Sequence, residues 1–245
     1  MNEEIKFNLE ALLNESLKKL NSSSLQSIVD DFLLSTPYFI NLNPESSQDK
    51  PTYNEIERVK RALKNPELIN SFEVARKMEF NKDEIIKELK SDILNSIPEM
   101  KESITRSNIK YKKQILFLEY DHEPIACLCG FGKGSYPILK NPEYIDYNYR
   151  EELYNGIGKV DYRKIWKNLI EFDQILDELN IFYQIIDTEL YHNLSDSYRY
   201  KTYLFLYETF DELSIEIFEG IPIEKPLMIY GNEHDLEAIN IYAFT

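Results

Sequence analysis

Cysteine, glycine and long apolar runs are scarce in this chain, and each scarcity excludes a class of protein. Only 2 cysteines occur among 245 residues, so a disulfide framework cannot hold the fold together. Glycine is also scarce, with 7 residues. No apolar run approaches the roughly 20 residues that a membrane-spanning helix needs. The first residues, MNEEIKFNLE, lack the apolar core of a secretion signal. We therefore expect a cytoplasmic protein with reduced thiols.

Basic residues are also scarce, above all in the carboxyl-terminal part of the chain. The net charge is −15. Residues 143–245 have 21 acidic and 8 basic residues, whereas residues 1–142 have 22 and 20. A surface this negative repels nucleic-acid phosphates and anionic membranes, and it attracts basic proteins. We therefore expect a basic protein partner and no direct binding to nucleic acid or to a membrane. The oligomeric state is left open.

One stretch has the opposite charge. Residues 58–113 have 14 basic and 9 acidic residues. We interpret this excess as pairing with the acidic carboxyl-terminal part of the same molecule, because such pairing needs no partner. An acidic partner is the alternative.

Apolar periodicity predicts an α+β fold. Apolar residues recur at helical spacing in five segments before residue 110 and in one segment after it. The segments are 3–20, 25–33, 52–63, 66–78, 81–98 and about 160–179. We expect a helical region, residues 1–110, packed on a mainly antiparallel sheet built from hairpins in residues 111–245. The helix at about 160–179 is expected against the sheet, and the two regions are expected to form one continuous globular unit.

Three pairs of apolar runs, each joined by an acidic turn, predict the hairpins of the sheet. The pairs are 115–120 with 125–131, 203–208 with 213–218, and 227–230 with 238–244, and residues 181–187 predict a further strand. A helix over 198–218 is the alternative, because Tyr200, Tyr203 and Tyr207 also fit a period near 3.6. The alternation from Leu213 to Ile217 favours strands. The segment from Asn155 to Gly158 predicts a turn.

Motifs that would specify a reaction are absent or incomplete. The glycine-rich loop Gly130–Ser135 follows a strand, as phosphate-binding loops do, but it has neither the P-loop nor the dinucleotide-binding spacing. We interpret it as a tight turn. A ligand-binding or catalytic site between this loop and the sheet is the alternative.

The remaining candidate residues also have simpler interpretations. His122 and His234 each lie between two acidic residues, which is typical of a polar turn as well as of a metal site. His192 has no partner for a catalytic triad. Glu119 and Asp121 resemble a Mg²⁺-binding carboxylate pair, but the net charge disfavours a nuclease. Cys127 and Cys129 are predicted to be inert thiols, because no cation lies near them in the sequence. We expect no metal and no other cofactor.

The acidic residues of the three predicted turns form the candidate site. Hairpins that project their turns in the same direction would align eight carboxylates along one rim of the sheet. These are Asp121, Glu123, Glu208, Asp211, Glu212, Glu233, Asp235 and Glu237, supported from behind by Tyr120, Tyr207 and Tyr230. Carboxylates beside aromatic rings suit the recognition of Lys and Arg on another protein. The simpler interpretation is that acids at hairpin tips are merely solvated.

These observations favour a non-catalytic acidic interaction protein over an enzyme. Acidic intracellular proteins without catalytic motifs resemble bacterial immunity-type inhibitors, so occlusion of a basic toxin is our leading hypothesis. The first alternative is an enzyme or ligand-binding protein with a site near Gly130–Ser135. The second is a structural or assembly subunit that uses the tyrosine-rich segment 136–158.

Overall fold

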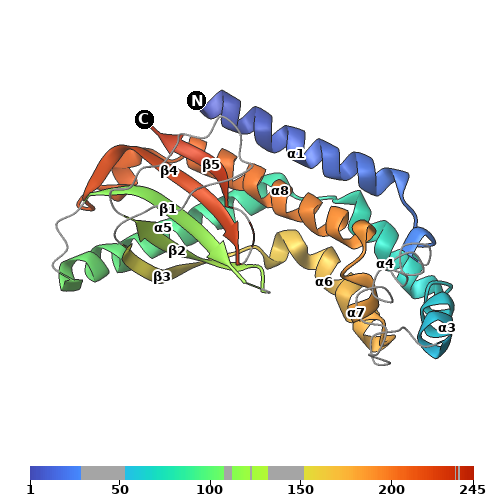
Figure 1. Cartoon of the computed structure of the whole chain (residues 1–245). Helices are drawn as coiled ribbons and strands as arrows, with labels where there is room; N and C mark the ends of the chain where they lie inside the picture. The colour runs from blue at the N-terminus through green and yellow to red at the C-terminus, as the bar shows by residue number, and fades with distance from the viewer. Residues whose placement is uncertain (29–52, 108–111, 122, 132–151, 235, 237) are drawn as a thin grey trace, which may run out of the picture. The chain divides into compact units, whose positions relative to one another are not determined.

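The structure of the chain is a computed structural model that describes residues 1–28, 53–107, 112–121, 123–131, 152–234, 236 and 238–245 (Figure 1). The chain divides into two compact units. The sheet unit comprises Met1–Leu12, Phe80–Ile165 and Tyr200–Thr245, and the helical unit comprises Leu13–Glu79 and Trp166–Arg199. Three helices contribute to both units: α1 (Asn2–Ser22), α6 (Arg163–Glu178) and α8 (Glu189–Asp211). The predicted division at residue 110 stays a prediction.

The helical unit adds α3 (Tyr53–Ala62), α4 (Pro66–Lys77) and the short α7 (Phe182–Ile185). α4 begins at Pro66, the first residue of the predicted segment 66–78, and the Asn65 side chain accepts the N–H of Glu67 at 2.8 Å. The rings of Phe72 and Phe172, 5.7 Å apart, join α4 to α6 in the core. The predicted helix over 25–33 lies largely outside the described residues.

The sheet unit contains five strands in the order β3-β2-β1-β4-β5. The strands are β1 (Lys113–Tyr120), β2 (Ile125–Phe131), β3 (Glu152–Asp161), β4 (Ile223–Glu233) and β5 (Ile239–Phe244). Three of the four pairings are antiparallel, and the central β1–β4 pairing is parallel. Helices α1, α3, α4 and α5 (Lys82–Ser107) precede the first strand. The predicted α+β class, with amino-terminal helices and a mainly antiparallel sheet, is confirmed.

The two sides of the sheet have different environments. One side packs on the second half of α8, where the rings of Tyr207 and Phe210 lie 5.5 and 6.2 Å from the ring of Tyr242. On this side Gly231 permits close approach, because an added Cβ would lie 2.3 Å from the Tyr203 ring. The opposite side has the ring of Phe117, flanked by Phe131 at 5.1 Å and Tyr230 at 5.5 Å. We call it the thiol side, because it also carries Cys127 and Cys129, which pair with Glu119 and Phe117 of β1.

The predicted strands at 181–187 and 203–218 are wrong. Residues 182–185 form α7, residues 189–211 form α8, and Ile215–Phe218 form the 3₁₀ helix η1. Burial explains the error, because from Ser197 to Phe210 every side chain of α8 is buried or half-buried. A helix without a solvent-exposed face lacks the apolar and polar alternation that reveals a 3.6-residue period. The helix that the sequence offered as the alternative for 198–218 is therefore correct for most of this segment.

Strand β3 was not predicted. Gly156 and Gly158, taken as part of a turn, lie inside the strand with φ of +67° and +70°. The register of β3 against β2 shifts at several points along this segment. Glycine in a left-handed conformation is as typical of an irregularity within a strand as of a turn.

Candidate functional site

Two of the three predicted hairpins place their turns at the same end of the sheet, where β1 and β4 finish. Because β1 and β4 are parallel neighbours, the turns that follow them leave the sheet at the same end. The N–H of His234, after β4, donates to the carbonyl of Tyr120, at the end of β1, at 2.8 Å. These ends carry Asp121 and Glu123, both exposed, and the half-buried Glu233. We call these three residues the acidic edge.

The predicted aromatic support differs among the three tyrosines. The Tyr120 hydroxyl donates to Oε2 of Glu233 at 3.0 Å, so this ring does stand behind the acidic edge. Tyr230 is fully buried on the thiol side of the sheet. Tyr207 belongs to α8, where burial and the charge of Asp211 raise its pKa to about 12.

The acidic residues assigned to the second hairpin do not lie in a hairpin turn. Glu208 belongs to α8, and Glu212 follows that helix directly. Nζ of Lys82 lies 2.8 Å from Oε1 of Glu208, and Nζ of Lys90 lies 3.4 Å from Oε2 of Glu212. Both lysines belong to α5, so the expected pairing of the basic stretch with acids of the carboxyl-terminal part occurs here. These two carboxylates have cations of their own chain.

Asp211 is also removed from the acidic edge. It is the last residue of α8, and the hydroxyl of Tyr242 donates to its Oδ1 at 3.3 Å. Tyr242 pairs with Ile229 in the middle of β4, away from the turn that follows this strand. The last two predicted rim residues, Asp235 and Glu237, lie outside the described residues.

The end of β3 extends the acidic edge. Asp161 pairs with Ile125, the first residue of β2, and the N–H of the next residue, Tyr162, donates to the carbonyl of Pro124 at 2.8 Å. The guanidinium of Arg163 donates to the Asp161 carboxylate at 3.0 Å, and this hydrogen bond lowers the pKa of Asp161. Asp161 therefore adds an ionised carboxylate beside the turn that carries Glu123.

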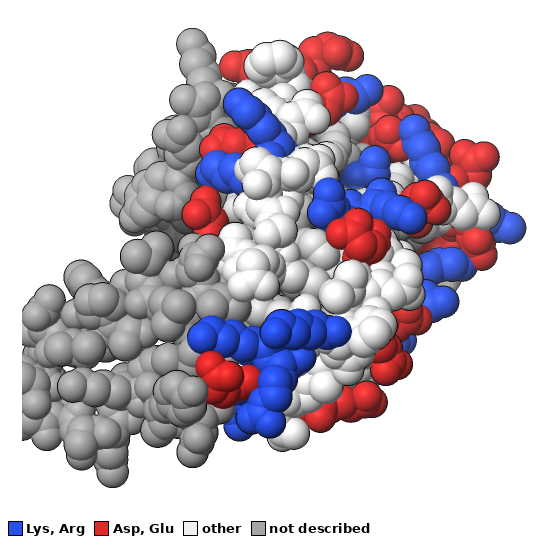
Figure 2. Space-filling model, turned by 90° about the vertical axis from the view of Figure 1, so that its right-hand side faces the viewer, with Lys and Arg blue, Asp and Glu red and all other residues white. Residues whose placement is uncertain are grey.

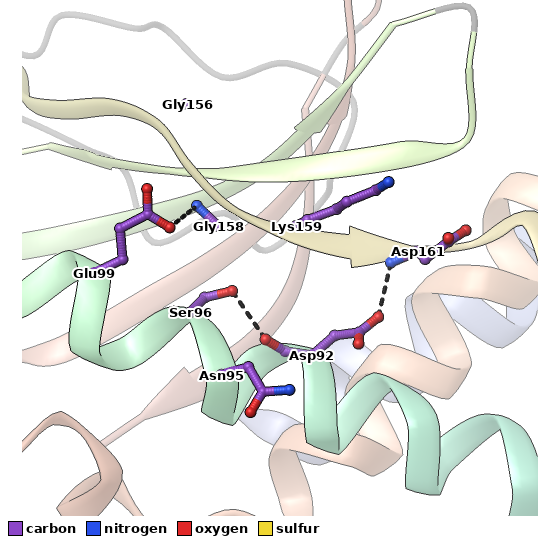
Figure 3. Close-up of a pocket in the computed structure, with 8 residues that line it drawn as sticks. All are labelled: Asp92, Asn95, Ser96, Glu99, Gly156, Gly158, Lys159 and Asp161. Atoms are coloured by element: carbon purple, nitrogen blue, oxygen red, sulfur yellow. Dashed lines mark hydrogen bonds between the residues drawn. The ribbon is translucent and has the colours of Figure 1, made fainter.

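A polar pocket of about 480 Å³ lies next to Asp161, between α5 and β3 (Figure 3). α5 presents four polar side chains toward it at helical spacing: Asp92, Asn95, Ser96 and Glu99. The strand contributes Gly156, Gly158, Lys159 and Asp161. Asp161 is already paired with Arg163, so two carboxylates, Asp92 and Glu99, face one lysine, and the pocket favours a cationic group over an anionic one.

The α5 carboxylates also complete the hydrogen bonding of an edge strand. Asp92 accepts the N–H of Asp161 at 3.0 Å, and Glu99 accepts the N–H of Gly158 at 3.1 Å (Figure 3). Edge strands present unpaired N–H groups that would otherwise pair with other chains. Gly158 approaches α5 closely, because an added Cβ would lie 2.2 Å from Oγ of Ser96. The backbones of α5 and β3 therefore lie close together at this point.

A polar row crosses the thiol side of the sheet. Asn232 of β4 pairs with Glu119 of β1, which pairs with Cys127 of β2, so the three side chains point the same way. On β5, Asn240 is 5% exposed, and neither atom of its amide has a hydrogen-bond partner in the described part of the chain. Buried amides without partners are uncommon. Asn240 pairs with Tyr230 of β4 and so lies on the same side of the sheet as this row.

Several predicted candidates fall outside the described residues. His122, the loop from residue 132 to Ser135 and most of the segment 136–158 belong to this group. His192 lies on α8 with its side chain exposed. Among the residues that the structure describes, no group of three or more His, Cys, Asp and Glu side chains has the arrangement of a metal site. Within the same residues, no helix has the length and apolar character needed to span a bilayer.

The rest of the basic stretch is divided between the units. α3, in the helical unit, carries Arg58, Lys60 and Arg61, and Nζ of Lys60 lies 3.2 Å from Oε1 of Glu57. Figure 2 shows Lys and Arg side chains grouped on a face that also carries acidic ones. The ion pair of Lys60 lies within α3, whereas an acidic residue of α5 pairs with a lysine of another helix. Nζ of Lys164, on α6, lies 2.7 Å from Oε1 of Glu88, on α5.

Comparison of the chain with protein-family models, with curated proteins and with solved structures finds no match in any of the three.

Proposed function

We propose that this protein is a non-catalytic interaction protein that binds a basic partner protein through the acidic edge and Asp161. One observation carries the proposal: the parallel pairing of β1 with β4 brings Asp121, Glu123 and Glu233 to the same end of the sheet. Asp161 joins them through the pairing of β3 with β2. Glu208, Asp211 and Glu212 are not part of the proposed surface, because they lie on or directly after α8 and not at this end of the sheet.

The charge of this surface supports recognition more than affinity. Ion pairs between exposed side chains contribute about 0–1 kcal/mol each. The same charges steer a basic partner toward the surface and reject acidic ones. Tight binding therefore requires additional buried contacts from the partner. The effect of the acidic edge is expected mainly in the association rate and its salt dependence.

Within this class, we favour an immunity-type inhibitor that covers the basic surface of a toxin. The absence of a reaction-specific motif and the net charge of −15 support this choice. The pocket beside Asp161 supports it as well, since the carboxylates of Asp92 and Glu99 suit a Lys or Arg side chain of such a partner.

The test is affinity capture from the source cell with two variants of equal charge. The edge variant is Asp121→Lys with Glu123→Lys. The matched control is Glu219→Lys with Glu224→Lys, at the opposite end of β4. Each substitution adds two positive charges, so both variants have a net charge of −11 instead of −15.

We expect the wild type and the control to capture the same basic protein, and the edge variant to lose it. Capture should also weaken as the salt concentration rises. Retention of the partner by the edge variant, or equal loss from both variants, would show that the acidic edge is not the binding surface.

A second candidate function is a ligand-binding protein or enzyme with its site on the thiol side of the sheet. The buried Asn240 amide of β5, without a partner in the described residues, favours it. Native mass spectrometry of protein purified from the source cell tests this candidate. A copurifying small molecule that Asn240→Leu loses, and that Glu219→Lys keeps, would support it. Protein that carries no small molecule would count against it.

A further inference from the structure

Cys127 and Cys129 form a close pair of thiols on the thiol side of the sheet. Residues two apart on a strand point to the same side. Their Sγ atoms lie 3.9 Å apart, although Cα atoms at this spacing in an extended strand are about 6.5 Å apart. The two side chains therefore lean toward each other along β2.

The surroundings of the pair make the two thiols unequal. Cys129 is 1% exposed, whereas Cys127 is half-buried and accessible to a small reagent. The N–H of Gly156, in a left-handed conformation, donates to Sγ of Cys129 at 3.5 Å. Sγ of Cys127 donates to the carbonyl of Glu119 at 3.5 Å. The accessible thiol and the buried one are thus suited to different steps of one reaction.

The contact between the two thiols also changes the pKa of each. A hydrogen bond from Cys129 lowers the pKa of Cys127 to about 7, and the same contact together with burial raises the pKa of Cys129. The thiolate is the nucleophile in thiol–disulfide exchange, and an attacking thiol is most effective when its pKa is near the ambient pH. Cys127 is therefore the attacking group, contrary to the inert thiol that the sequence predicts.

We propose that Cys127 and Cys129 form a redox modification site that reacts with low-molecular-weight disulfides. The Cys127 thiolate attacks one sulfur of glutathione disulfide, which forms a protein–glutathione disulfide and releases one glutathione thiolate. That thiolate takes the proton of Cys129. The Cys129 thiolate then attacks Sγ of Cys127, which forms the Cys127–Cys129 disulfide and releases the second glutathione. The protein dithiol loses two electrons, and glutathione disulfide gains them.

Strand β2 can accommodate this bond. A disulfide needs an S–S distance of about 2.05 Å, so the sulfurs must approach by roughly 2 Å. The register of β2 against β3 shifts between Ala126 and Leu128 and again between Leu128 and Gly130. The extra residues at these shifts belong to β3, whose partner positions are three residues apart where those of β2 are two apart. The neighbouring strand β3 can therefore adjust beside both cysteines, while β2 keeps its regular pairing with β1.

The test treats the reduced full-length protein and two single variants with glutathione disulfide and follows their intact masses. We expect the wild type to lose two hydrogens without retaining glutathione. Cys129→Ser should stop with one glutathione attached, because the second nucleophile is missing. Cys127→Ser should react at least about tenfold more slowly than the wild type, since the accessible thiolate is gone. Circular dichroism of each variant confirms folding before the reaction.

Three results would overturn the proposal. The first is a wild type that stays reduced, and the second is a wild type that retains glutathione. The third is a Cys127→Ser variant that reacts as fast as the wild type. If the Cys129→Ser variant fails to fold, Cys129→Ala takes its place, because alanine also lacks the second nucleophile and preserves an apolar site.

Discussion

The contact between Gly231 and Tyr203 gives the sharpest test of how α8 packs on the sheet. The backbone of Gly231 is not in the left-handed conformation, so an alanine there causes no backbone strain. It strains only the packing of the side chains around it. Its Cβ would lie 2.3, 2.5 and 2.8 Å from Cε1, Cζ and Cδ1 of Tyr203, a side chain that is 1% exposed. A buried ring cannot turn into solvent, so the helix or the strand must move. Overpacking of this kind costs about 1–3 kcal/mol.

A double-mutant cycle separates this clash from a general loss of stability. Gly231→Ala alone is expected to lower the free energy of unfolding by about 2–3 kcal/mol. Tyr203→Leu removes Cε1 and Cζ, so the double variant should be less destabilised than the sum of the single ones by about 1–2 kcal/mol. Tyr203→Phe keeps both atoms, and with Gly231→Ala it should give no such relief. Urea unfolding followed by circular dichroism measures all six proteins: the wild type, the three single variants and the two double variants.

Two results would refute this reasoning. One is a Gly231→Ala protein within about 0.5 kcal/mol of the wild type, which is the range of neutral surface substitutions. The other is a double variant with Tyr203→Leu whose effects are simply additive, because independent sites add. Either result would mean that the second half of α8 does not lie against β4.

Two further predictions concern charge. Burial raises the pKa of Asp173 to about 7, so the folded state keeps a proton that the unfolded state has lost, and stability falls as the pH rises from about 4 to 7. Thermal unfolding should show Asp173→Asn to be more stable than the wild type by about 1–4 kcal/mol above pH 7 and equally stable below about pH 4. The control Asp177→Asn, at an exposed position, should show no such difference. Lys90→Ala should cost less than about 1 kcal/mol, because its ion pair with Glu212 is exposed, and the exchanged pair Lys90→Glu with Glu212→Lys should recover that loss in urea unfolding.

The sequence predicts those elements whose local pattern matches their environment. The hairpin of β1 and β2 was predicted because two apolar runs flank a polar turn, and α4 because apolar residues recur at helical spacing over 66–78. α8 was missed because helix burial on nearly all sides removes the period that identifies a helix. The parallel pairing of β1 with β4 joins strands about a hundred residues apart, and no local pattern encodes it.

The candidate site divides in the same way. Asp121, Glu123 and Glu233 were predicted because they lie in the turns of two correctly identified hairpins. Asp161 was missed because it falls within the helix predicted at about 160–179, whereas in the structure it ends β3. The pocket wall on α5 had a signal that could have found it, since four polar residues, 92, 95, 96 and 99, follow one another at helical spacing in a helix that also carries an apolar face.

Carbodiimide crosslinking of a short polylysine peptide to the full-length protein tests the central claim most directly. This reaction joins an amine to the carboxylate that it contacts, and peptide mapping by mass spectrometry identifies the site. The account predicts adducts concentrated on Asp121, Glu123 and Asp161 at low salt, and their loss at high salt. Adducts that occur equally on Glu219 and Glu224, at the other end of β4, would contradict the account.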